Sequence, residues 1–296
     1  MIPVEQDVSL EVLDWGGTGR PLVLLTGLGD DAHIFDEFAP KLTANYHVYG
    51  ISRRGRGGSS KPEAKKVNYT ADRLGEDVLA VIDALHLNKP IVAGHSIAGE
   101  ELSYIGSHHP ERIAALIYIE AGYPYALYDE VNGQLELDAI QLRKQLRQFT
   151  NGYAEEPVKE YDELNANLER IEKEIKQHQR DTKDLPPTPI SPRMTPDLFA
   201  IMYGRERFTT IHAPALVIFA TDPNPISGND PQVRAQAVRQ ALMMRDKASQ
   251  IAAWKRQVPS AHIVLIPHGT HYVFQSNQAD VLREMNEFIS TIPPAK

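Results

Sequence analysis

The stretch that decides the fold is Gly94-His95-Ser96-Ile97-Ala98-Gly99. It follows a short apolar run at residues 90–93 and precedes a helical pattern at residues 100–108. Gly94 and Ala98 are small, as a sharp turn between a strand and a helix requires. The stretch therefore predicts a strand, a tight turn with Ser96 at its apex, and then a helix.

Such a turn suits Ser96 to act as a nucleophile. A serine hydroxyl is weakly nucleophilic, so its Oγ must stand clear of the sheet where a base can reach it. A helix that begins at Ser96 also directs free backbone N–H groups toward developing negative charge. The motif departs from the usual G-x-S-x-G in one place, because Ala98 takes the second glycine position. We interpret the stretch as a nucleophile elbow.

Two other stretches extend this interpretation. Thr26-Gly27-Leu28-Gly29-Asp30 follows the apolar run 22–25, and Arg54-Gly55-Arg56-Gly57-Gly58-Ser59 follows the run 48–51. Together with His271 near the C-terminus, these motifs resemble those of the α/β-hydrolase superfamily. The resemblance covers roughly residues 8–289 and implies the α/β-hydrolase fold, with a mainly parallel central sheet flanked by helices.

The hydrophobic pattern agrees with an α/β fold. The predicted core strands are residues 8–13, 21–26, 47–52, 90–93, 113–119, 215–220 and 261–266. The predicted core helices are residues 33–42, 70–87, 100–108, 232–258 and 278–289, the second of them capped by Thr70. Alternating strands and helices imply crossovers between parallel strands, and sites in such sheets lie at the carboxyl ends of the strands.

Residues 123–210 interrupt this alternation with charged, amphipathic helical patterns, at residues 134–149 and 158–179. One interpretation is a solvated helical hairpin. The other is a cap over the active site, because the superfamily usually inserts one after the strand that ends near residue 119. We favour the cap, and divide the chain into a core at residues 1–122 and 211–296 and a helical cap at residues 123–210.

The catalytic base should be a histidine just beyond the last strand. Two histidines lie there, in the stretch Pro267-His268-Gly269-Thr270-His271-Tyr272. The stretch is similar to the superfamily's final motif, in which the second histidine matches. The resemblance therefore assigns the base to His271, whereas His268 suits an exposed loop.

The acid that orients this base has two candidates. Superfamily members usually place it after the strand at residues 215–220, which offers Asp222, although the local sequence is one residue short of the common spacing. A minority use the end of the preceding strand, where Glu120 follows residues 117–119. That segment resembles a haloalkane dehalogenase subgroup in which a glutamate is the acid. We predict Glu120 and keep Asp222 as the alternative, which could instead cap a turn.

The oxyanion hole should use two backbone N–H groups. One belongs to Ile97, the residue after the nucleophile, and the other most simply to Leu28 in the turn after residues 22–26. Thr26 stands where many superfamily members have histidine, so the support of that turn differs here. We interpret the turn at residues 52–59 as structural rather than catalytic.

Composition excludes several other classes of protein. The formal net charge is −8, and the tight basic cluster Arg53, Arg54 and Arg56 lies in a turn, so no basic stripe for a nucleic acid is present. The chain has no cysteine, which excludes disulfides, thiolate chemistry and cysteine-based zinc sites.

The N-terminal residues lack the apolar core of a signal peptide, and no apolar run is long enough to span a bilayer. We expect no membrane span and a cytoplasmic location, with export as the alternative if a leader has been removed. The sequence leaves the oligomeric state open.

The resemblance implies a serine hydrolase of esterase type. Ser96, His271 and Glu120 would cleave a carboxylic ester or a related small acyl compound through an acyl-enzyme, with no metal or organic cofactor. The dehalogenases attack with aspartate where this chain has Ser96, so their activity does not carry over. Hydrolysis of carbon–carbon bonds and cofactor-free perhydrolysis use the same triad and are alternatives. A small-molecule receptor on a hydrolase fold is the non-enzymatic alternative.

Overall fold

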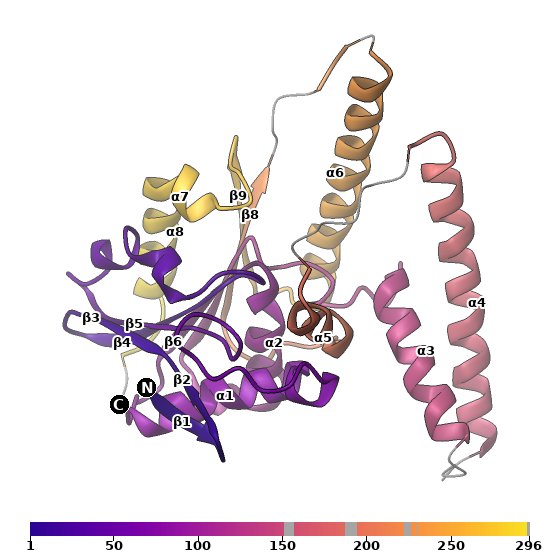
Figure 1. The fold of residues 1–296 in the computed structure, drawn as a ribbon. Helices are drawn as coiled ribbons and strands as arrows, with labels where there is room; N and C mark the ends of the chain where they lie inside the picture. Colours follow the sequence, from indigo (N-terminus) through magenta and orange to yellow (C-terminus); the bar gives the residue numbers. More distant parts are fainter. Residues whose placement is uncertain (151–156, 187–193, 222–225, 229, 295–296) are drawn as a thin grey trace.

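The computed structural model describes residues 1–150, 157–186, 194–221, 226–228 and 230–294. Its central element is a seven-stranded sheet with the strand order β3-β5-β4-β6-β7-β8-β9 (Figure 1). The strands are β3 (Val12–Gly16), β4 (Arg20–Leu25), β5 (Tyr46–Ile51), β6 (Ile91–His95), β7 (Ala115–Ile119), β8 (Ala215–Thr221) and β9 (His262–Pro267). The edge strand β3 pairs antiparallel with β5, and the remaining pairs are parallel. The predicted mainly parallel α/β sheet is confirmed.

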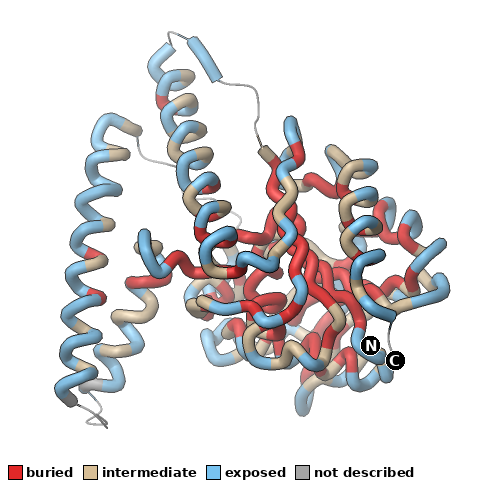
Figure 2. The backbone as a smooth tube through the Cα atoms, turned by 180° about the vertical axis from the view of Figure 1, so that it is seen from behind, coloured by how far each residue is buried: buried red, intermediate tan, exposed pale blue. Residues whose placement is uncertain are grey.

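Helices cover both faces of this sheet. The core helices are α1 (Ala71–Ala84), α2 (Gly99–His108), α6 (Pro231–Gln257), α7 (Val273–Ser276) and α8 (Gln278–Ser290). In β4, Val23 and Leu25 join one buried cluster with α1, α2 and the end of α6. Leu22 and Leu24 point to the opposite face and join a second cluster with α7 and α8. The sheet is therefore the buried middle layer, drawn red in Figure 2.

The strand predicted at residues 8–13 is divided in two. β2 (Val8–Leu10) pairs antiparallel with β1 (Ile2–Glu5) outside the main sheet, and β3 begins two residues later. Between them, the Glu11 N–H donates to Ser59 Oγ at 2.8 Å, and the Glu11 carbonyl accepts from the backbone after β5. The backbone of Glu11 is thus bound by the turn at residues 52–59, and this interrupts the strand.

Two local predictions about helices are corrected. The helix predicted at residues 33–42 is two short 3₁₀ helices, Ala32–Phe35 and Ala39–Lys41. Pro40 lies inside the predicted helix and lacks the N–H group that would donate to the Asp36 carbonyl, so one continuous α-helix is disfavoured there. Thr70 precedes α1 in an extended conformation, but its side chain makes no capping hydrogen bond.

Where the structure describes it, the insertion at residues 123–210 is mainly helical, with α3 (Leu135–Thr150), α4 (Pro157–Thr182) and α5 (Pro196–Gly204). α3 and α4 form a hairpin that stands away from the sheet (Figures 1 and 2). α5 packs on the core instead, where Leu198 and Ile201 share a buried cluster with Ile97. None of the helices in the described ranges is long and apolar enough to cross a membrane.

A buried polar network attaches the α3–α4 hairpin to the segments of the insertion on either side of it, at Tyr128 and Arg207. The Tyr128 hydroxyl donates to Asp138 at 2.5 Å and accepts from Arg170 at 2.5 Å. Arg207 forms an ion pair with the same carboxylate, and its guanidinium lies 4.6 Å from the centre of the Tyr128 ring. Asp138 is fully buried, and these charged hydrogen bonds offset the free-energy cost of removing its carboxylate from water.

The start of α2 generates a testable prediction. A Cβ on Gly99 would lie 2.2 Å from the Ala121 carbonyl oxygen and 2.9 Å from Ala126 Cβ. Alanine normally stabilises a helix relative to glycine. Because there is no space at this position, we expect Gly99→Ala instead to lower the free energy of unfolding by about 1–3 kcal/mol in urea denaturation.

The matched control is Gly29→Ala, where an added Cβ meets nothing within 4 Å. Its free energy of unfolding should change by no more than about 0.5 kcal/mol. Equal effects at both positions would contradict the close packing of α2 against residues 121–126.

Candidate active site

The turn after β6 has the geometry expected of a nucleophile elbow. Ser96 has φ of 55°, in the left-handed region that is costly for residues other than glycine. A Cβ on Gly94 would lie 2.9 Å from Ala98 Cβ, so this turn needs small residues. Helical backbone starts at Ser96 with a 3₁₀ turn and continues as α2.

His271 lies in the loop between β9 and α7. Its Nε2 is 2.9 Å from Ser96 Oγ, and its side chain is half exposed. His268 is exposed, and its backbone N–H donates to the Thr221 carbonyl at 2.7 Å, which extends the β8–β9 pairing. It is therefore His271 that the structure brings within hydrogen-bond distance of Ser96.

Glu120 follows β7 directly, with a φ of 48° and a side chain that is only 1% exposed. Its Oε2 lies 3.7 Å from Nδ1 of His271. This distance is longer than a hydrogen bond, so in this structure the two groups interact electrostatically. The other predicted acid, Asp222, lies outside the described residues.

Three neighbouring groups bind the buried carboxylate of Glu120. The backbone N–H of Ala220 donates to Oε1 at 2.6 Å, and the Lys247 ammonium donates to the same oxygen at 2.8 Å. The Tyr123 hydroxyl donates to Oε2. Burial raises the pKa of Glu120, but His271, Lys247 and Tyr123 together outweigh burial and hold this pKa below its ordinary value. The carboxylate is therefore ionised at neutral pH.

Lys247 is a site residue that the sequence analysis missed. It lies on α6, which also reaches the core through Trp254, whose indole N–H donates to the Gly122 carbonyl at 2.6 Å. The Lys247 ammonium also donates to the Ala220 carbonyl at 2.6 Å. No local motif marks this lysine, because its partners lie on β7 and β8, far away in the chain.

The two predicted oxyanion residues lie together beside the elbow. Ile97 is 4% exposed and belongs to the cluster formed with α5. Leu28 packs against the same cluster from the turn after β4. The side chains of the two residues therefore meet in one cluster next to the elbow.

Tyr125 is a further group at the nucleophile. From the sequence alone, Tyr125 could line an aromatic pocket or simply pack in the core. Burial raises the pKa of Tyr125 well above its ordinary value, and the nearby Ser96 has a smaller, opposing effect. The Tyr125 ring packs against the start of α2, 3.1 Å from where a Cβ on Gly99 would lie. Tyr125 is thus a neutral phenol close to the nucleophile.

His95 supports the loop that carries His271. Its Nε2 lies 2.9 Å from the His271 carbonyl oxygen, so this nitrogen carries the proton and donates. The two imidazole rings are 4.8 Å apart. Burial lowers the pKa of His95 to about 4, against the opposing effect of the hydrogen bond to the His271 carbonyl. His95 is therefore neutral at pH 7 and acts as a structural donor.

Glu100 is a second buried carboxyl group near the elbow. It is fully buried in the first turn of α2, and neither of its oxygens has a hydrogen-bond partner among the described residues. Burial, and then the negative charge of Glu101, raise the pKa of Glu100 well above its ordinary value. Burial therefore favours the protonated, neutral form of Glu100.

The neutral state of His95 predicts how stability depends on pH. An unfolded chain protonates this histidine near pH 6.5, whereas the folded chain resists protonation down to about pH 4. The contribution of His95 to folding is thus fully present above pH 6.5 and is lost as the pH falls toward 4, with a slope of up to about 1.4 kcal/mol per pH unit. We expect His95→Gln to remove this part of the slope, because the amide can still donate but does not titrate.

The measurement is urea denaturation at several pH values between 4 and 7. His268→Gln is the control, since its ring is exposed. A wild-type slope that His95→Gln leaves unchanged would show that His95 is not the group responsible.

Comparisons with known proteins agree with this architecture. The sequence profile described as alpha/beta hydrolase fold matches residues 20–186. The chain is 32% identical over 136 residues to a dihydrolipoyllysine-residue acetyltransferase component of the acetoin cleaving system of Pseudomonas putida, covering 45% of this chain and 35% of that protein. It is 26% identical over 170 residues to 3-oxoadipate enol-lactonase 2 of Acinetobacter baylyi, covering 55% and 62%.

A solved structure described as a marine microorganism esterase shares the fold. It superposes with a TM-score of 0.57 at 19% identity, and the match covers 95% of this chain and 99% of that one. The chain spans less than two thirds of the length of the curated relatives quoted above. The strand order, the turn at Ser96 and the profile match lead to the same result: the chain belongs to the α/β-hydrolase fold family.

Proposed function

We propose that this protein is a hydrolase, and specifically a serine hydrolase that cleaves a carboxylic ester or a related acyl compound through an acyl-enzyme. The observation that carries the proposal is the 2.9 Å contact between Ser96 Oγ and His271 Nε2, made at a strained turn where a helix begins. This contact is the nucleophile–base pair that acyl transfer requires.

The first half of the reaction acylates Ser96. Ser96 Oγ attacks the carbonyl carbon of the substrate while His271 Nε2 takes the hydroxyl proton. The carbonyl oxygen becomes an oxyanion, which accepts hydrogen bonds from the backbone N–H groups of Leu28 and Ile97. His271 then returns the proton to the leaving alcohol, and the acyl group remains on Ser96.

The second half repeats these steps with water as the nucleophile. His271 takes a proton from water, the hydroxide attacks the acyl-enzyme, and the carboxylic acid leaves as Ser96 regains its proton. During both halves His271 carries a positive charge that the ionised Glu120 stabilises. The 3.7 Å separation closes to a hydrogen bond when that charge develops, since catalytic contacts are often loose without substrate.

Lys247 has a defined part in this scheme. Its ammonium neutralises Glu120 when His271 is uncharged, so the buried carboxylate is never left without a cation. It also leaves Oε2 to Tyr123 and His271, since Lys247 binds Oε1. The carboxylate is thus held with one oxygen directed toward the base.

We assign the insertion at residues 123–210 the role of a cap on the core of residues 1–122 and 211–296. The part next to the site is α5, which packs with Ile97 and Leu28. Tyr125, at the start of the insertion, lies close to Ser96. These apolar and phenolic groups would surround the acyl part of a small substrate.

Two of the similar proteins are consistent with an ester substrate. The lactonase acts, by its name, on a lactone, which is a cyclic carboxylic ester. The neighbour described as an esterase has the same fold.

The nucleophile can be tested directly. A fluorophosphonate should label the wild-type protein once, and fragment mass spectrometry should place the adduct on Ser96, because His271 makes this hydroxyl the activated one. Ser96→Ala should give no adduct and no turnover of an ester panel of varied acyl length. An adduct on another residue of an active sample would contradict the assignment.

The role of Glu120 as the acid can be tested with Glu120→Gln, which replaces one carboxylate oxygen by an amide nitrogen. Glu120→Gln should retain the fold but lower kcat by roughly 10²–10⁴-fold, since an amide cannot stabilise the charge on His271; a similar change in a serine-protease triad costs about 10⁴-fold. Asp222→Asn should have a much smaller effect. The measurement is steady-state turnover of the best ester.

Glu120→Gln leaves the Lys247 ammonium unpaired, so a control is needed. Adding Lys247→Met removes that charge, and kcat should stay low while stability recovers. Full recovery of kcat in the double variant, or a larger loss in Asp222→Asn, would rule out Glu120 as the acid.

A further inference from the structure

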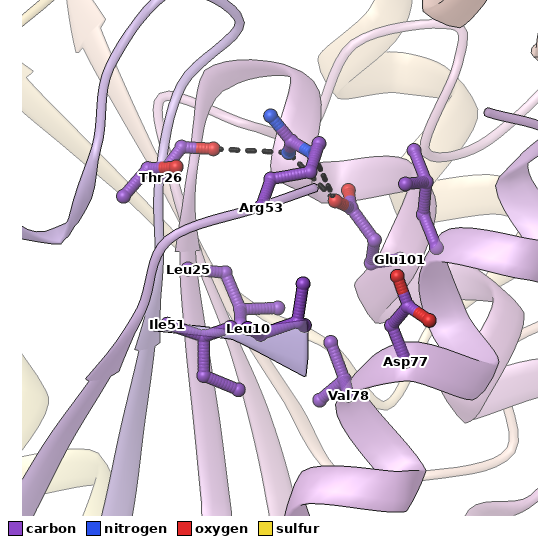
Figure 3. Close-up of a pocket in the computed structure, with 9 residues that line it drawn as sticks. Leu10, Leu25, Thr26, Ile51, Arg53, Asp77, Val78 and Glu101 are labelled. Atoms are coloured by element: carbon purple, nitrogen blue, oxygen red, sulfur yellow. Dashed lines mark hydrogen bonds and ion pairs between the residues drawn. The ribbon is translucent and has the colours of Figure 1, made fainter. Parts of the chain in front are cut away.

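The turn that carries Leu28 is held by a buried arginine. Arg53 Nη2 donates to the Thr26 carbonyl at 3.1 Å, and Nη1 donates to the Gly27 carbonyl at 3.1 Å. Arg53 Nε donates to Glu101 Oε1 at 2.6 Å. Figure 3 shows the guanidinium between Thr26 on one side and Glu101 on the other.

The contact with Gly27 determines the direction of the Leu28 N–H group. The Gly27 carbonyl and the Leu28 N–H belong to one planar trans peptide, so they point in opposite directions. A donor fixed on the carbonyl therefore fixes where the N–H points. A cationic donor also polarises the peptide, which makes the N–H a stronger hydrogen-bond donor.

Glu101 connects this turn to the elbow. It lies in the first turn of α2, the helix that continues from Ser96 and Ile97. The Arg53–Glu101 pair therefore ties the peptide of Leu28 to the helix that follows Ile97. The side chains of Arg53 and Glu101 are each only 4% exposed.

Little space surrounds this pair. The cavity beside it, which Figure 3 shows, has a volume of about 10 Å³ and is otherwise lined mainly by apolar side chains such as Leu25 and Ile51. That volume is close to the minimum for a single water molecule. The contacts of Arg53 are consequently made in a setting of low dielectric constant, where charged hydrogen bonds are strong.

We propose that Arg53 is a positioning residue for the oxyanion hole, which holds the Leu28 N–H in register with the Ile97 N–H through its contacts to Gly27, Thr26 and Glu101. This inference rests on the proposed function, and it gives a catalytic consequence to a turn that the sequence presents as structural. Arg53 acts through the backbone and does not touch the substrate.

The neighbouring Arg54 provides a matched control. It follows Arg53 in the same turn, is fully buried, and forms a bidentate pair with Asp77 on α1 at 2.5 and 2.6 Å. Its remaining contacts go to Glu5 and the Asn68 carbonyl, away from the turn after β4. Any loss of stability that comes simply from replacing a buried arginine should therefore be similar at Arg53 and at Arg54.

The test compares Arg53→Lys with Arg54→Lys. Lysine keeps the charge, but its single ammonium cannot reproduce the planar fork that reaches two carbonyls and a carboxylate. Removing an oxyanion donor costs about 10²–10³-fold in kcat, so misorienting one should cost roughly 10–10²-fold, with little change in KM. The affinity for a trifluoromethyl ketone, which forms a tetrahedral oxyanion on Ser96, should fall by the same factor. Below its melting temperature, Arg54→Lys should retain the wild-type kcat and the wild-type affinity for the trifluoromethyl ketone.

A second readout does not depend on catalysis. Amide hydrogen exchange, measured by mass spectrometry, should become faster in peptides covering residues 26–30 of Arg53→Lys and should be unchanged there in Arg54→Lys. If Arg53→Lys does not fold, Glu101→Gln replaces it, because the amide keeps the shape and weakens the hold on Arg53.

The outcomes separate this inference from the proposed function. Equal losses of kcat in the two lysine variants, or unchanged exchange at residues 26–30 in Arg53→Lys, would overturn the role of Arg53. Absence of wild-type turnover and of Ser96 labelling would overturn the proposed function instead, and the exchange experiment would still decide whether Arg53 holds the turn.

Discussion

The site depends on one buried negative charge, the carboxylate of Glu120. An ionised group at the end of a buried strand is stable only when it is paired and hydrogen-bonded. Here the partners come from four separate parts of the chain: Tyr123 after β7, Ala220 at the end of β8, Lys247 on α6, and His271 after β9. The contacts with this single carboxylate therefore hold together the segments that surround the nucleophile.

Three residues with strained backbone lie at the same edge of the sheet. Ser96, Glu120 and His268 all have positive φ, and they follow β6, β7 and β9 respectively. Each such residue costs on the order of 1–3 kcal/mol and persists only where packing imposes it. The cost is offset by the two apolar layers on the sheet, and the strained turns direct the side chains of Ser96 and Glu120 toward the base.

Local patterns failed where long-range contacts or a single residue outweighed them. The helix predicted at residues 33–42 is broken because Pro40 lies inside it. The strand predicted at residues 8–13 is divided because the backbone of Glu11 binds a distant turn. On α4 the apolar spacing was correct, but Leu168 and Ile175 stay 44% and 41% exposed, since the α3–α4 hairpin stands away from the sheet.

The sequence by itself determined the alternation of parallel strands and helices in the core, the elbow at Ser96 and the position of His271 after the last strand. Each of these features is formed by residues that are close together in the chain, so its pattern can be recognised in the sequence. Only the tertiary structure decided the supporting contacts. Lys247 lies 127 residues from the carboxylate that it binds, and Arg53 lies 48 residues from its acidic partner. The sequence around a charged residue does not indicate its distant partner, because the packing of strands and helices determines which charged groups come together.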